Sequence, residues 1–179
     1  MQRRKAFQLA LWTAGGFLLT GGRCLAKTFL SEDQAKRVLM KGKSLKRVEV
    51  TLSKDQEKAI EKASKARVIK RELDVYKASD GSWFIIDHVI GKHEFIDYAV
   101  SLTNQGKVTG IEVLTYRETY GDEITNPKWR AQFYGRGPGA PLKVDKEIKN
   151  ISGATLSCVH ITVGINRLTQ TWDKVLRYL

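Results

Sequence analysis

Four apolar segments follow one another between residues 71 and 116, and short polar turns separate them. Residues 71–77 alternate apolar and polar side chains, whereas residues 83–89, 93–102 and 108–116 are more continuously apolar. Turns rich in glycine, asparagine and aspartate between such segments are typical of antiparallel strands joined in sequence. The sequence therefore predicts an antiparallel β-meander of about four to five strands.

Helical segments are expected on both sides of this meander. Two short helices should begin after the capping-type sequences at Ser31 and Ser53, and a long helix should run from about Thr155 to Tyr178. Gly164 is unfavourable inside a helix, so it predicts close packing on the sheet. The expected class is α+β, with the meander packed against the long C-terminal helix and two N-terminal helices.

The first 26 residues have the pattern of an export signal. Arg3, Arg4 and Lys5 precede an apolar run, and small residues follow at the two positions that a signal peptidase recognises, Cys24 and Ala26. The run is short and rich in glycine for a membrane span, which favours cleavage over a retained anchor. The paired arginines also loosely resemble a twin-arginine signal, which would export the protein already folded.

The sequence thus divides into three predicted parts, of which cleavage removes the first. Residues 1–26 are the signal peptide, residues 27–67 an N-terminal helical segment, and residues 68–179 the main domain. We therefore expect a periplasmic protein.

The chain is strongly basic, with a formal net charge of +12 and a pI near 9.8. Such a charge often indicates nucleic-acid binding. The signal holds four of the basic residues and no acidic one, so the mature chain would still carry +8, but in a compartment where nucleic acid is rarely met. We therefore expect a membrane or periplasmic redox partner and no nucleic acid.

Cysteine and histidine give no metal or catalytic constellation. Cys158 is the only cysteine left after cleavage, which excludes a disulfide framework and a cysteine-based metal site. Its apolar and hydroxylated neighbours predict a buried thiol. We expect structural roles for His88, His93 and His160, because each lacks further ligands at suitable spacing.

Residues 150–157 open the long helix with small and hydroxylated side chains. Ser152 is the predicted N-cap, and Gly153 would allow a ligand to approach the backbone closely. The first helical turn offers free N–H groups, which bind anions such as phosphate. From the residues alone, a phosphate site and an ordinary capped helix both remain open.

Three features together resemble the exported FMN-binding domain. This domain also carries flavin in the peripheral subunits of Rnf-type electron-transport complexes and sodium-pumping NADH:quinone reductases. The features are Glu118-Thr119-x-Gly121 after the meander, Trp129-x-x-Gln132-Phe133, and Ser152-Gly153-Ala154-Thr155-Leu156-Ser157. They cover roughly residues 82–170, and the third is the most specific.

The resemblance implies a flavoprotein of electron transport, with FMN linked to Thr155 as a phosphothreonine ester by a separate FAD-dependent flavin transferase. The flavin ring would lie toward residues 118–121 and Trp129. Arg117 and Lys128 would be either basic neighbours of the cofactor or surface charges. The implied cofactor-binding residues are Glu118, Thr119, Gly121, Trp129, Ser152, Gly153, Ala154, Thr155, Leu156 and Ser157.

Some residues depart from the family pattern. Lys149 stands where the attachment motif usually has an aspartate, and Tyr120 stands where the complex subunits have proline. Covalent and non-covalent FMN binding therefore both remain open. Two further functions are also open: a non-catalytic exported module that binds another anion at residues 152–157, and a reductase whose donor and acceptor the sequence does not name.

Overall fold

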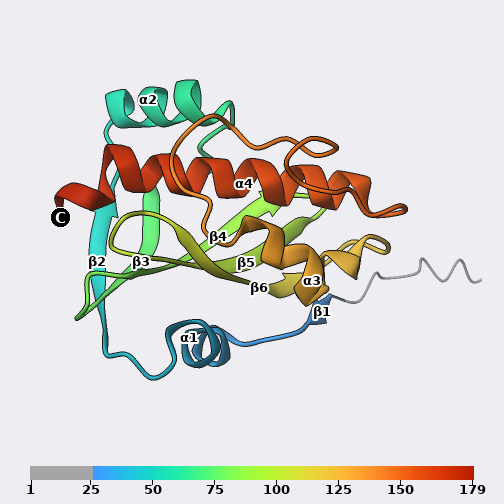
Figure 1. The fold of residues 1–179 in the computed structure, drawn as a ribbon, viewed down its shortest axis with the longest axis horizontal. Coiled ribbons are helices and arrows are strands. Elements are labelled where there is room, and N and C mark those ends of the chain that lie inside the picture. Colours follow the sequence, from blue (N-terminus) through green and yellow to red (C-terminus); the bar gives the residue numbers. More distant parts are fainter. Residues whose placement is uncertain (1–25) are drawn as a thin grey trace, which may run out of the picture.

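One antiparallel sheet of six strands forms the centre of the computed structural model, which describes residues 26–179 (Figure 1). The order across the sheet is β1-β6-β5-β4-β3-β2, so strands next to each other in space are also consecutive in sequence except for β1 and β6. The strands are β1 (Lys27–Thr28), β2 (Leu45–Thr51), β3 (Glu72–Ala78), β4 (Trp83–Ile90), β5 (Phe95–Leu102) and β6 (Val108–Tyr116).

The predicted meander is confirmed as β3 to β6, but the sheet has six strands rather than four to five. The two additional strands lie at the edges and come from residues 27–67, for which only helices were expected. β2 pairs with β3 along all seven of its residues. Its sequence, LKRVEVT, is mostly charged or polar because an edge strand leaves much of its surface in water, so its apolar alternation is weak.

Helices cover both faces of the sheet. α1 (Glu32–Met40) packs against β4, β5 and β6 on one face, and α4 (Thr155–Lys174) lies along the other face (Figure 1). α2 (Lys54–Ser64) packs on α4. Both N-terminal helices begin with a capping box, at Ser31 and Ser53. No helix within residues 26–179 is long and apolar enough to cross a membrane.

Short helical turns complete the chain. They are η1 (Asp122–Thr125), α3 (Pro127–Arg130) and η2 (Ala131–Phe133) between the sheet and α4, and η3 (Leu176–Tyr178) after it. The long helix was predicted to continue to Tyr178, but α4 ends at Lys174 and a 3-10 turn follows.

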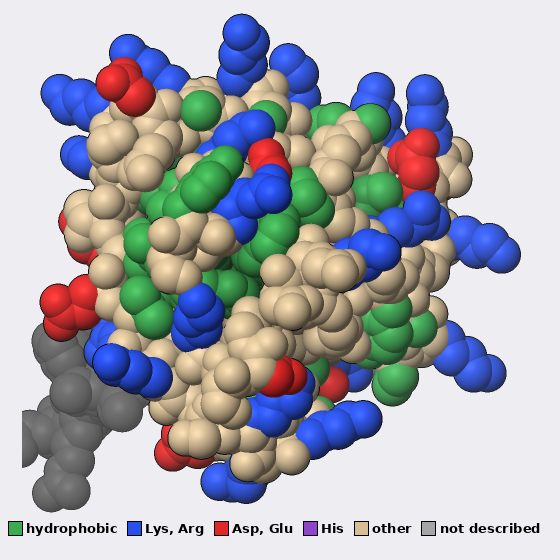
Figure 2. All heavy atoms as spheres, turned by 60° about the vertical axis from the view of Figure 1, so that its left-hand side comes forward, with side chains coloured by type: hydrophobic (Ala, Val, Ile, Leu, Met, Phe, Trp, Pro, Cys, Tyr) green, Lys and Arg blue, Asp and Glu red, His purple; other side chains and the backbone are tan. Residues whose placement is uncertain are grey.

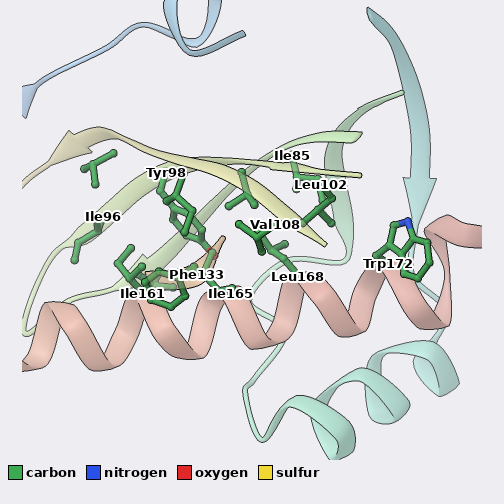
Figure 3. Packing of buried hydrophobic residues seen from close by; sticks show 14 of the residues in the cluster. Ile85, Ile96, Tyr98, Leu102, Val108, Phe133, Ile161, Ile165, Leu168 and Trp172 are labelled. Carbon is green, nitrogen blue, oxygen red and sulfur yellow. The ribbon is translucent and has the colours of Figure 1, made fainter. Parts of the chain in front are cut away.

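The main core fills the space between the sheet and α4. Ile161, Ile165 and Leu168 of α4 point toward the sheet and share one cluster with Tyr98 and Phe133, and all five side chains are buried (Figure 3). Cys158 lies in the same cluster, so the expected buried thiol is confirmed. A smaller cluster under α1 covers the opposite face of the sheet.

Gly164 allows α4 to approach the sheet closely, as the sequence predicted. A Cβ atom at this position would lie 2.3 Å from the hydroxyl of Tyr98 and 2.8 Å from Cγ1 of Val89. The Tyr98 hydroxyl donates to Asp87 Oδ2 at 2.7 Å, and Arg167 of α4 donates to the same oxygen at 2.6 Å. This buried network fixes the position of α4, and therefore of its N-terminal end, relative to the sheet.

Candidate functional site

A hollow of about 450 Å³ lies at the N-terminal end of α4. Three segments that are distant in sequence surround it: the β4–β5 hairpin, the loop after β6 and the first turn of α4. The lining residues are Lys92, His93, Glu118, Thr119, Tyr120, Gly153, Ala154, Thr155, Leu156 and Ser157. Two of the three sequence features therefore meet in one place.

The first turn of α4 has no side-chain cap. Ser152 was predicted to be the N-cap, but the N-cap is Ala154, which makes no side-chain hydrogen bond. The difference arises because Gly153 has a positive φ of 88° and the Ala154 N–H donates to the carbonyl of Ile151, so the chain makes a turn before the helix begins. The N–H groups of this turn thus have no side-chain oxygen as acceptor, and the residues that carry them line the hollow.

Thr155 is the first residue of α4, and its side chain is exposed. Its hydroxyl oxygen accepts a hydrogen bond of 3.1 Å from Nδ2 of Asn150. Asn150 also accepts from the N–H of Ile151, so its amide is held on both sides. The Thr155 hydroxyl is therefore oriented at the mouth of the hollow beside the positive end of the helix dipole.

Glu118 holds the tip of the β4–β5 hairpin. Its Oε1 accepts the backbone N–H groups of His93 and Glu94, the latter at 2.9 Å. Gly91 permits this contact, because a Cβ atom there would lie 2.6 Å from the same oxygen. Glu118 therefore keeps Lys92 and His93 at the rim of the hollow, in addition to lining it.

A pH titration can test this role of Glu118. Burial raises the pKa of its carboxyl, but the N–H groups of Glu94 and His93 outweigh that effect and hold the pKa below its ordinary value. The stabilisation is present above the unfolded pKa near 4.5 and is lost as the pH falls through the folded value. In urea unfolding, Glu118→Gln should be less stable than wild type at pH 7, and the difference should shrink below pH 4.5. An unchanged difference at pH 3 would contradict this.

Gly121 allows the loop after β6 to approach the first turn of α4 closely. A Cβ atom at Gly121 would lie 2.6 Å from both the hydroxyl of Tyr116 and Oγ of Ser157. These two oxygens are hydrogen-bonded to each other at 2.8 Å, and the Tyr116 hydroxyl also contacts the carbonyl of Tyr120. The loop after β6 is thereby attached to the first turn of α4. Gly121 itself is not among the residues that line the hollow.

Trp129 and Ser152 do not line the hollow either. Trp129 is buried, its ring packs edge-on against Phe133, and its indole N–H donates to the carbonyl of Lys149 at 2.8 Å. Gln132 accepts the N–H of Lys149 at 2.7 Å. The Trp129-x-x-Gln132-Phe133 feature thus supports the backbone just before residues 150–157.

The structure also places the two basic residues that the sequence left undecided. Arg117 binds Asp97 at 2.6 Å on β5, and neither Arg117 nor Lys128 lines the hollow. Sequence reasoning missed Lys92 and His93, which do line it. The only local signal for them was the turn at Gly91-Lys92, and nothing in that turn shows that Glu118 binds it.

A comparison with known protein families finds a match that includes this hollow. Residues 91–170 match the family model of the FMN-binding domain. They include all the lining residues of the hollow. Residues 91–170 belong to the FMN-binding domain family. The cofactor of this domain is FMN.

Among solved structures, six chains match. One is the crystal structure of Shewanella oneidensis NqrC, with a TM-score of 0.45 and 15% identity over 83% of this chain and 85% of that chain. No curated protein matches the chain.

The chemistry of the hollow in the FMN-binding domain suits the phosphate of FMN. Uncapped N–H groups and the helix dipole favour an anion, and Lys92 and His93 add donors at the opposite rim. At Gly153 nothing lies within 4 Å of an added Cβ atom, so the backbone there is open to a ligand. The hydroxyls of Thr119, Thr155 and Ser157 supply further hydrogen-bonding groups.

Proposed function

We propose that this chain is a periplasmic flavoprotein that relays electrons, with FMN held in the hollow at the start of α4. The observation that carries the proposal is the exposed hydroxyl of Thr155 beside an uncapped helix N-terminus within the FMN-binding domain. When bound, FMN exchanges one or two electrons. The chain's own residues bind and orient the cofactor, and we propose no separate substrate chemistry.

Thr155 is the proposed attachment point. A phosphoester needs an accessible hydroxyl whose product phosphate is stabilised, and the helix dipole supplies that stabilisation. Asn150 orients the hydroxyl, and the segment before it is held by Gln132 and Trp129 through the backbone of Lys149. These backbone contacts do not depend on the side chain at position 149, which supports attachment despite the lysine there.

The proposed compartment and partner follow from the signal pattern and the charge. Residues 1–25 lie outside the described part of the chain. On the face in Figure 2, Lys and Arg side chains far outnumber Asp and Glu and project around most of the outline. Such a surface attracts an acidic redox protein or an anionic membrane surface. The proposed attachment also requires a FAD-dependent flavin transferase as an earlier partner.

Production with and without the transferase tests the proposal. The purified protein should be yellow, and after denaturing electrophoresis its band should fluoresce only when the transferase was present. Yellow protein with a dark band would retain FMN binding and exclude the covalent bond. Colourless protein under both conditions would contradict the flavin function and favour a module for another anion.

A further inference from the structure

β2 forms an open edge of the sheet (Figure 1). Within residues 26–179, no backbone hydrogen bond joins β2 to any element other than β3. A second hollow, of about 580 Å³, lies against β2, and residues 46–49 contribute to its lining. Because consecutive strand residues point to opposite faces, a hollow lined by a run of neighbours includes the edge itself. The backbone of β2 is therefore accessible to another strand.

The hydrogen bonds at both ends of β2 show which of its backbone groups point outward. The N–H of Leu52, the residue after β2, donates to the carbonyl of Arg71 and thus points toward β3. At the other end, the N–H of Ala78, opposite Leu45, donates to the carbonyl of Ser82 and thus points away from β2. Because this orientation alternates along an antiparallel strand, the outward groups belong to every second residue. These residues are Leu45, Arg47, Glu49 and Thr51.

The charges of these outward residues are self-complementary. If a second copy of β2 pairs antiparallel about Val48, Arg47 of each copy lies opposite Glu49 of the other. The adjacent registers that also match the outward groups centre on Arg47 or on Glu49, so each places like charges directly opposite. Opposite charges stabilise a cross-strand pair and like charges destabilise it. The register centred on Val48 is therefore favoured, and it also pairs the whole length of the strand.

Glu49 lacks a cationic partner among residues 26–179, where it forms neither an ion pair nor a side-chain hydrogen bond. Its neighbour on β3 is Asp74, which has the same charge. The guanidinium of Arg47 lies 3.7 Å from Asp74 Oδ1, which is too long for a hydrogen bond. A second copy would supply the cation that Glu49 lacks.

We propose that β2 pairs with β2 of a second copy in this register and joins the two sheets about a twofold axis at Val48. Charged residues on an edge strand commonly prevent pairing, but here their order excludes the other registers and permits this one. Val48 is half-buried against the main core, and it would meet its counterpart where cross-strand side chains are closest. No residue of β2 lines the hollow at the start of α4, so that hollow stays accessible in both copies.

Analytical ultracentrifugation of the purified protein measures this association. The average mass of wild type should rise with concentration from that of one chain toward that of two, since a small interface gives a weak dimer. Arg47→Glu and Glu49→Arg each place like charges opposite one another, so each should weaken the dimer about tenfold. Lys46→Glu is the matched control, because it reverses a charge on the same strand but lies opposite Val50 of the second copy. Its dimer should be at least as stable as that of wild type.

Two combinations should restore the charge pairs. The double variant Arg47→Glu/Glu49→Arg exchanges the charges within one chain and should dimerise as wild type does. An equal mixture of the two single variants should form a heterodimer, because one chain is then acidic and the other basic at both positions. Thermal unfolding of each variant confirms that it is folded.

The inference is overturned if wild type stays monomeric at millimolar concentration. A dimer that neither single variant weakens also overturns it, since another surface then joins the copies. If monomeric wild type binds polyglutamate and Arg47→Glu does not, the edge receives an acidic strand from a different protein instead. None of these measurements involves flavin, so their outcome is independent of the proposed function.

Discussion

Replacing Thr155 by alanine is expected to abolish covalent flavin attachment. In protein produced with the transferase, fluorescence of the denatured Thr155→Ala band should fall to the gel background, because no other residue can supply the same oxygen beside Asn150. Thr155→Ser should keep the fluorescence, since it retains the hydroxyl. Thr155 is exposed, so its loss should change the free energy of unfolding by no more than about 0.5 kcal/mol.

Ser152→Ala is the matched control for this experiment. Ser152 is also an exposed hydroxyl of the same segment, but it neither caps α4 nor lines the hollow. Its substitution should leave the fluorescent band unchanged. A bright band from Thr155→Ala, or a dark one from Ser152→Ala, would move the attachment point away from Thr155.

Arg167→Leu is expected to cause the largest loss of stability. Arg167 is buried and donates to Asp87 Oδ2 at 2.6 Å, to the carbonyl of His88 at 2.9 Å and to the carbonyl of Arg67 at 2.8 Å. Removing the guanidinium leaves the half-buried carboxylate of Asp87 without its countercharge. Loss of one partner of such a pair costs about 3–5 kcal/mol. Urea unfolding at pH 7 measures the difference.

A double variant checks the reason for that loss. Asp87→Asn combined with Arg167→Leu removes both charges, so it should be more stable than Arg167→Leu alone. The exposed ion pair between Lys27 and Asp122 provides a contrast, because Lys27→Ala should cost no more than about 1 kcal/mol. Equal losses for Arg167→Leu and Lys27→Ala would show that the buried network contributes little.

The sequence predicts the parts of the fold that depend on local pattern. The meander follows from apolar segments and turns within residues 71–116, and Gly164 correctly indicates a close helix–sheet contact. β2 was missed because its pairing with β3 is encoded in neither segment alone. Ser152 was wrongly expected to cap α4, because the turn that delays the helix depends on the conformation of Gly153.

The resemblance predicts the site residues that belong to its motifs. Residues that reach the hollow only through contacts between distant parts of the sequence are harder to predict. Thr119 and Thr155 were both expected near the cofactor, and both line the first hollow. Trp129 was expected beside the ring, but its side chain is buried and holds the backbone of Lys149. His93 could not be predicted, since it reaches the hollow through a hydrogen bond to Glu118. Such pairings appear only once the sheet has formed.

The absence of a side-chain cap at Ala154 couples cofactor binding to the integrity of α4. An anion at this end completes the hydrogen bonding of the first turn, so it serves the helix as the missing cap. Occupied and empty protein should therefore differ in amide hydrogen exchange first at residues 155–157.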